Sequence, residues 1–281
     1  MPIVTAPDDA AEAASEAREP AEPGRLLGIL LPVVVFAVAV SLWEWLVKAN
    51  DIPPYILPAP SAIAATLVKD WGTLSTSLLV TLRTMGLALA LATAGGVLLA
   101  VIFAQSRLIE RSLYPFAVVL QVTPILAVAP LLLVYLDAGT AMLVCAFIVA
   151  FFPILSNTTL GLASTDPHLR DLFKLYGAGR WRELLLLRVP SALPYFLGGL
   201  RIGGGLALIG AVVAEIAAGS AGQGSGLAYR IVESGYRLNI PRMFAALILI
   251  SATGILVYTT LALLSHLLLR RWHESALDRG G

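Results

Sequence analysis

Residues 141–162 read AMLVCAFIVAFFPILSNTTLGL, a mostly apolar stretch without a charged side chain. A helix needs about 20 mostly apolar residues to cross the hydrocarbon core of a bilayer, so this stretch predicts a transmembrane helix. Across all 281 residues, 58% are hydrophobic and 13% are charged, whereas a soluble domain is about 25% charged. With a net charge of +1, the composition excludes a soluble enzyme, a disordered protein and a nucleic-acid-binding protein. We expect an integral membrane protein.

Five further stretches have the same character, so the sequence predicts an all-α bundle of about six transmembrane helices. The predicted spans are residues 26–47, 85–103, 113–136, 141–162, 193–218 and 243–269. The second is expected to start earlier, because residues 74–84 are also helix-like. The third contains Pro115, Pro124 and Pro130; proline removes a backbone donor and bends a helix, so we expect a kink there. A porin-type barrel would instead show alternating segments of about ten residues.

The distribution of charge predicts how the chain is oriented. Residues 1–25 are rich in Ala, Glu and Pro, which predicts a disordered tail and no signal peptide. With the N-terminus inside, the inner segments carry twelve Lys and Arg and the outer segments five, or six with Arg83. Inner loops of membrane proteins carry the excess of Lys and Arg. We therefore expect both termini in the cytoplasm and a membrane domain over residues 26–281.

The longest inner loop, residues 163–192, contains a short amphipathic helix. Asp166 can cap its N-terminus, Pro167 suits its first turn, and Gly177 is placed to end it. Apolar residues follow at helical spacing: Leu169, Leu172, Phe173 and Tyr176. Such a helix either lies on the membrane surface or docks into a groove of a partner protein, and the pattern by itself is compatible with both.

The same loop resembles the EAA loop of binding-protein-dependent ABC importer permeases. The family pattern is Glu-Ala-Ala, three residues, Gly, nine residues and Ile-x-Leu-Pro; here Asp-Leu-Phe replaces Glu-Ala-Ala, while Gly177 and Pro190 keep their spacing. The resemblance implies that this loop docks on an ATPase. The residues it assigns to that coupling are Asp166, Leu169, Asp171, Leu172, Phe173, Tyr176, Gly177 and Pro190.

Other segments are similar to the nitrate, sulfonate and taurine branch of the family. They are Tyr55-Ile-Leu-Pro-Ala-Pro-Ser61, Phe152-Pro-Ile-Leu-Ser-Asn-Thr158, and Ala214-Glu-Ile with Gly224-Ser-Gly-Leu227. The resemblance implies a type I importer fold in the bacterial plasma membrane. The implied partners are a second permease copy, a cytoplasmic ATP-binding subunit and an extracytoplasmic solute-binding protein. The implied substrate is a small polar solute, with a sulfonate- or nitrate-like anion preferred over a vitamin or pyrimidine precursor.

The sequence also lacks motifs that other functions would need. No Gly-x4-Gly-Lys-Ser/Thr is present to hold nucleotide phosphates, so ATP is expected on a partner subunit, and the chain is expected to be no enzyme and to need no cofactor. His168, His266 and His273 lack the spacing of a metal site. Two alternatives remain, a membrane-embedded enzyme and a secondary transporter; the first needs catalytic residues grouped at membrane depth and the second an internal repeat, and neither is evident.

Three polar residues in the predicted spans are candidates for a translocation path. Glu215 is the only acid well inside the fifth span, where an unpaired charge is costly, so it either lines a path or gate or forms a structural pair. Gln121 and Thr123 lie beside a proline in the third span and either line a path or form interhelical hydrogen bonds. Gly199 and Gly203 allow close helix contact, within the bundle or at a dimer contact.

Overall fold

The computed structural model describes residues 25–219 and 224–270, and all the regular elements in these ranges are helices. The predicted tail, residues 1–25, lies outside the described residues except for its last residue. The elements are α2 (Arg25–Ala49), α3 (Pro60–Lys69), α4 (Trp71–Gln105), α5 (Arg107–Val122), α6 (Ile125–Tyr135), α7 (Ala138–Ala163), α8 (Pro167–Leu175), α9 (Arg180–Glu183), a π-helical turn (Leu184–Arg188), α10 (Val189–Ala218), α11 (Leu227–Tyr236) and α12 (Ile240–Leu269).

Five of the described helical stretches are long and apolar enough to cross a membrane, and α5 with α6 makes a sixth if the bent pair is one span. The predicted all-α bundle with about six spans is therefore confirmed. α4 begins at Trp71, so the second span does start earlier than residue 85. α5 and α6 meet at 98°. The cause is Pro124, the N-cap residue of α6, which holds the preceding residue, Thr123, in an extended conformation.

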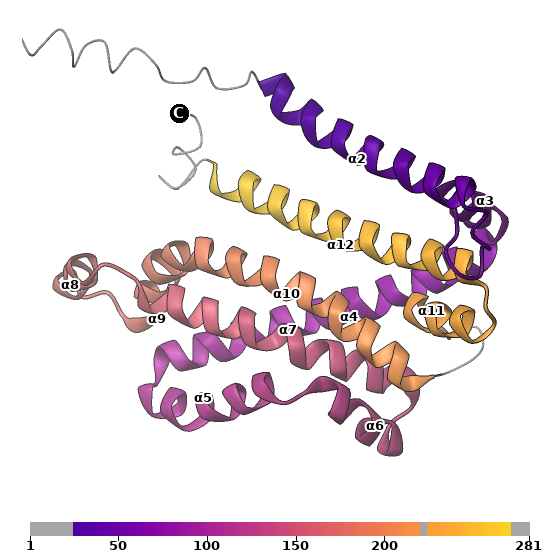
Figure 1. Cartoon of the computed structure of the whole chain (residues 1–281). Helices are drawn as coiled ribbons and strands as arrows, with labels where there is room; N and C mark the ends of the chain where they lie inside the picture. The colour runs from indigo at the N-terminus through magenta and orange to yellow at the C-terminus, as the bar shows by residue number, and fades with distance from the viewer. Residues whose placement is uncertain (1–24, 220–223, 271–281) are drawn as a thin grey trace, which may run out of the picture.

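The centre of the bundle is formed by α4, α7 and α10, with α7 and α10 the most extensively packed pair (Figure 1). Glycines allow the two helices to approach each other closely. A Cβ atom on Gly199 would lie 2.8 Å from both the Cβ of Asn157 and the carbonyl oxygen of Pro153, and one on Gly203 would lie 2.9 Å from Ile154 Cδ1. Close packing at these two glycines is confirmed, and the contact lies within one chain.

The short helices lie at both ends of the bundle, and different ones lie at each end. α2 and α12 run along one side, and α2 exposes large apolar side chains over most of its length. The start of α2 and the end of α12 lie toward the same end of the bundle as α8 (Figure 1). The short helices α3 and α11 lie at the opposite end, whereas α8 projects beyond the ends of the long helices.

Replacement of Gly199 by alanine is expected to destabilise the bundle, because the new methyl group meets the backbone of Pro153, which no side-chain rotation can relieve. Overpacking of this kind costs about 1–3 kcal/mol. Gly198→Ala is the matched control, since a Cβ atom there meets nothing within 4 Å and alanine favours a helix by about 1 kcal/mol over glycine. Thermal unfolding of the detergent-solubilised protein measures both variants. Equal midpoints would contradict the described contact between α7 and α10.

Candidate functional site

α8 is a short helix with defined ends and no buried residue. At its start, the Asp166 carboxylate accepts a hydrogen bond from the backbone N–H of His168 at 2.8 Å. After its end, Gly177 adopts a φ of +66°, a left-handed conformation that favours glycine. The Ala178 N–H then donates to the carbonyl of Phe173 at 2.9 Å. The cap and the stop that the sequence predicted are both present.

Most of the apolar stripe of α8 is exposed. Leu169 and Leu172 are 45% and 44% exposed and Tyr176 is 83% exposed, while Phe173 is half-buried. The apolar surface continues onto Trp181 of α9, which is also exposed. Burying a large apolar side chain contributes about 1.5–3 kcal/mol, so this surface, held away from its own bundle, has the chemistry of a docking face.

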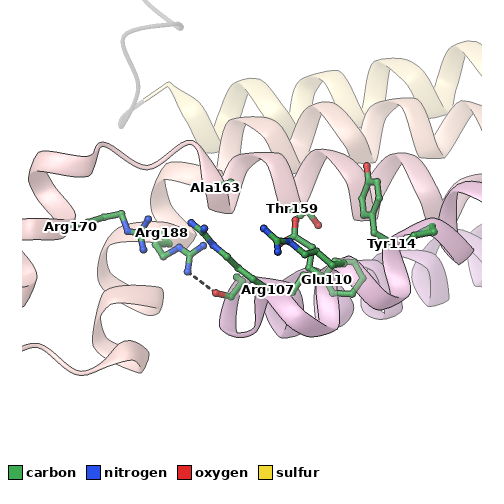
Figure 2. A pocket seen from close by; sticks show the side chains of 11 residues that line it. Arg107, Glu110, Tyr114, Thr159, Ala163, Arg170 and Arg188 are labelled. Carbon is green, nitrogen blue, oxygen red and sulfur yellow. Dashed lines mark hydrogen bonds between the residues drawn. The ribbon is translucent and has the colours of Figure 1, made fainter.

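A cavity of about 560 Å³ lies beside α8, where the ends of α4 and α7 meet the start of α5 (Figure 2). Its charged lining comes from several elements and is mostly cationic. The charged side chains are those of Arg107, Glu110, Arg111, Arg170 and Arg188. The cavity and α8 therefore share one residue, Arg170.

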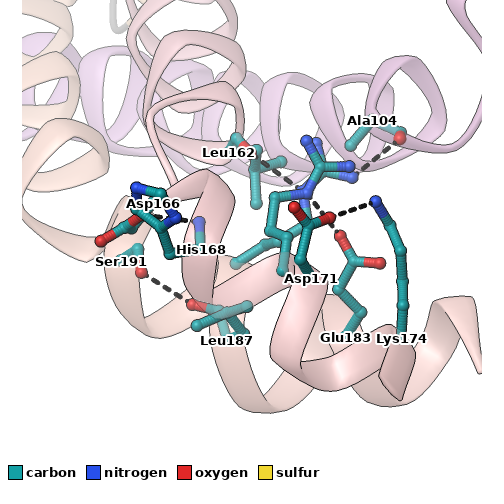
Figure 3. A network of polar contacts seen from close by, with 11 residues as sticks. Ala104, Leu162, Asp166, His168, Asp171, Lys174, Glu183, Leu187 and Ser191 are labelled. Carbon is teal, nitrogen blue, oxygen red and sulfur yellow. Dashed lines mark hydrogen bonds and ion pairs between the residues drawn. The ribbon is translucent and has the colours of Figure 1, made fainter. Parts of the chain in front are cut away.

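Polar contacts connect α8 with the membrane helices (Figure 3). Arg170 Nε on α8 donates to Glu183 Oε1 on α9 at 2.8 Å. In the π-helical turn that follows α9, Arg188 donates from Nε to the carbonyl of Leu162 at 2.9 Å and from Nη1 to the carbonyl of Ala104 at 3.0 Å. These carbonyls lie in the last turns of α7 and α4, where backbone acceptors lack helical partners, so Arg188 joins the ends of two long helices.

The coupling residues predicted from the sequence lie in two places. Pro190 is exposed in the first turn of α10, directly after the π-helical turn. Proline at this position removes a backbone donor where a helix begins, which is tolerated. The remaining seven lie on α8 or immediately beside it: Asp166, Leu169, Asp171, Leu172, Phe173, Tyr176 and Gly177.

Glu215 is 1% exposed in α10 and forms no ion pair with any described residue. Its carboxylate accepts hydrogen bonds from the Thr81 hydroxyl of α4 at 2.7 Å and from the backbone N–H of Ala228 in α11 at 2.9 Å. The Thr81 oxygen also accepts from the N–H of Leu227 at 3.0 Å. A side chain on Gly226 would overlap the carboxylate. Glu215 therefore faces the interior, where it joins α4, α10 and the start of α11.

Gln121 and Thr123 lie at the end of α5, at the bend into α6. The Gln121 side chain is exposed and has no hydrogen bond to the described residues. The Thr123 hydroxyl donates to the carbonyl of Val119 in the last turn of α5 at 2.7 Å. The structure thus places both residues at the helix break, and no hydrogen bond connects either of them with Glu215.

The chain matches the family described as binding-protein-dependent transport system inner membrane component over residues 92–273. This range contains α8, the π-helical turn and Glu215. The chain belongs to this family. It is a multi-pass membrane protein and the permease component of an ABC importer, as its sequence resemblance implied.

Relatives of the permease match along nearly their whole lengths. The formylaminopyrimidine transport permease protein ThiX of Halalkalibacterium halodurans is 33% identical over 85% of this chain and 95% of its own. The riboflavin transport system permease protein RibX of Chloroflexus aurantiacus is 34% identical, and the match covers 87% of this chain and 90% of the relative. The putative aliphatic sulfonates transport permease protein SsuC of Bacillus subtilis is 28% identical, and the match covers 90% of this chain and 92% of the relative. The similarity to the sulfonate branch is thereby confirmed, and it extends to permeases for heterocyclic compounds.

The permease is also similar in fold to a chain in the crystal structure of an amino acid ABC transporter with histidines. The TM-score is 0.57 at 21% sequence identity, and the match covers 74% of this chain and 97% of that chain. At this identity the likeness concerns the fold, and it agrees with the importer-like architecture expected from the sequence.

Sequence analysis of the permease found Glu215 but missed Thr81, its hydrogen-bond partner. The two residues are 134 positions apart, and a threonine in an apolar helix gives no local sign of a distant partner. It also missed that Arg188 joins α4 and α7. The place of Arg188 two residues before Pro190 in the loop motif was the available signal, and a motif position does not reveal which carbonyl oxygens an arginine contacts.

Glu183→Gln is expected to loosen α8, because it removes the carboxylate that pairs with Arg170 and is only 13% exposed. A pair of this kind contributes about 1 kcal/mol, so hydrogen exchange of the α8 amides should become about fivefold faster. Asp171→Asn is the matched control. Asp171 also forms an ion pair, and Lys174 holds the pKa of its carboxyl below the usual value. The two side chains are 64–66% exposed, however, and exposed pairs contribute little to stability. Identical exchange in both variants would contradict a role for Glu183 in holding α8.

Proposed function

We propose that α8 is the element through which a cytoplasmic ATP-binding subunit drives this permease. The observation that carries the proposal is the exposed apolar face of a capped helix that projects beyond the ends of the long helices. A helix lying on the membrane surface would bury this face in the interface, but projection away from the bundle favours a groove on a partner protein. On this proposal α8 and both chain termini are cytoplasmic, in the plasma membrane of a bacterium.

The contacts of α8 provide a route for movement into the membrane. A displacement of α8 acts on α9 through Arg170 and Glu183. From there Arg188 acts on the ends of α4 and α7 through two carbonyl oxygens. ATP binds and is hydrolysed on the partner subunit, consistent with the absence of a phosphate-binding loop motif in this sequence. The permease itself performs no chemistry and carries no cofactor.

We further propose that the permease works as a homodimer, with the path for the solute between the two copies. α7 and α10 touch through glycines, which leaves no room between them for a solute. Gln121 and Thr123 lie at a break in a helix pair with many exposed apolar side chains, and we assign them to the path. Glu215 acts as part of a gate, because it holds the start of α11 against α4 and α10. A solute-binding protein delivers the solute at the α3 and α11 end.

For the substrate, the relatives support a heterocyclic vitamin or vitamin precursor. The permeases named for formylaminopyrimidine and riboflavin are 33% and 34% identical to this chain, compared with 28% for the permease named for aliphatic sulfonates. A sulfonate- or nitrate-like anion, preferred from the sequence, is the second candidate, because the sulfonate permease matches over 90% of the chain.

Capture of the ATP-binding subunit by the purified permease tests the role of α8. Gly177→Pro is expected to abolish capture for two reasons. Proline requires a φ near −65°, whereas the φ of Gly177 is +66°. Proline also lacks the N–H that Gly177 donates to the Lys174 carbonyl. Loss of a docking element costs about 2 kcal/mol or more. Gly179→Pro is the matched control, since its φ is −68°, and it should capture the subunit as wild type does. Undiminished capture by a folded Gly177→Pro variant would overturn the assignment of α8.

Uptake by cells in which this chain is the only permease of its kind tests the substrate. We expect labelled riboflavin or a formylaminopyrimidine to accumulate, and we expect the Gly177→Pro variant to reduce accumulation to background because its ATPase coupling is lost. Accumulation of an aliphatic sulfonate without either heterocycle would instead support the anion. Accumulation of none of these solutes by the wild type would contradict both substrate classes.

A further inference from the structure

Four arginines from three separate parts of the chain surround the cavity of about 560 Å³ beside α8. Arg107 and Arg111 come from the first turns of α5, Arg170 comes from α8, and Arg188 comes from the π-helical turn. Figure 2 shows the side chains of Arg107, Arg170 and Arg188 converging on the same space. The cavity is therefore a meeting point of α8, the π-helical turn and the ends of the long helices.

The positive charge of this lining is only partly neutralised within the described residues. Arg170 pairs with Glu183, but Arg188 donates to two uncharged carbonyl oxygens and so keeps its full charge. No carboxylate of the described residues lies within 4.0 Å of the nitrogens of Arg107 or Arg111. Glu110 is the only acidic residue in the lining. The excess of cationic groups favours an anionic occupant.

Two further features show that the lining is arranged for a hydrogen-bonding ligand. The Arg188 guanidinium is fixed by its bonds to Leu162 and Ala104, so little side-chain freedom is lost when it binds. Thr159 also lines this cavity, and its hydroxyl is buried without a hydrogen-bond partner among the described residues. A buried hydroxyl without a partner is unfavourable, and a small rotation of the Thr159 side chain toward the cavity would let a ligand oxygen accept its hydrogen bond.

The general enrichment of arginine at the inner face of membrane proteins explains the presence of these residues but not their convergence. It gives no reason for four arginines to line one cavity, or for an unpaired hydroxyl to lie among them. The planar guanidinium group matches the oxygens of phosphate and carboxylate in a bidentate manner. We propose that this cavity binds a phosphate-type oxyanion, either free or as the headgroup of an anionic phospholipid.

Such a ligand would connect α5 with α8, because Arg107 and Arg111 lie on one and Arg170 on the other. It would thereby add a link between the proposed ATPase-coupling helix and the bundle. The site lies beyond the proposed function and does not depend on which solute the permease imports.

Ligand binding to the full-length chain tests the proposal, with inorganic phosphate as one probe and phosphatidylglycerol as the other. Radiolabelled phosphate is titrated against the purified protein in detergent, and retained lipid is measured by native mass spectrometry against phosphatidylcholine. The double variant Arg107→Gln/Arg111→Gln removes two cations that make no hydrogen bond to described residues, so the fold should be retained. Arg180→Gln/Arg182→Gln is the matched control, with the same change in charge on the exposed surface of α9.

We expect the Arg107→Gln/Arg111→Gln variant to bind the anion at least about tenfold more weakly, because it loses two charge-assisted contacts. The control variant should bind as the wild type does. Thr159→Val should also weaken binding, without a change in charge. Saturable phosphate binding identifies a free oxyanion, and selective retention of phosphatidylglycerol alone identifies a lipid headgroup; either supports the site. The absence of both, or equal losses in the two double variants, would overturn it.

Discussion

The direct contact between α7 and α10 is the constraint on which the rest of the structure depends. At Gly199 and Gly203 there is no room for a side chain between the two helices. Helices in contact at this distance cannot slide past each other without a clash, because packed interiors have little free volume. The segment that joins these two helices in sequence contains α8. On the proposed coupling, a displacement of α8 would therefore act on one end of a pair of helices that their close packing holds together.

Polar contacts then connect this pair to α4 at both ends. At the α8 end, Arg188 reaches the carbonyl of Ala104. At the opposite end, Glu215 accepts from Thr81. Both sites place a charged or polar group in a setting where an unsatisfied one would be costly, so both contacts are hard to break in isolation. On the proposed coupling, the glycine contact would make α7 and α10 move together, and the two polar sites would pass that movement to α4 and α11.

The parts of this architecture that depend on local chemistry were predictable from the sequence. Span positions followed from apolar length, the break between α5 and α6 from its prolines, and the ends of α8 from Asp166 and Gly177. Contacts between distant residues were not predictable. Arg188 and Ala104 are 84 positions apart, and several carbonyl oxygens near the helix ends were equally available to an arginine. The cavity depends on four arginines, and nothing in the sequence indicated that these residues come together.

Arg170 connects the two functional proposals, because it pairs with Glu183 and also lines the cavity. A guanidinium group has five N–H donors, and the described pair uses the one on Nε. An oxyanion in the cavity can therefore bind the remaining donors of Arg170 without displacing Glu183. It would add a contact between α8 and the start of α5 while the existing contact between α8 and α9 persists. An occupied cavity would thus hold α8 more rigidly against the bundle, and the stiffness of the coupling segment would depend on an anion that is not the transported solute.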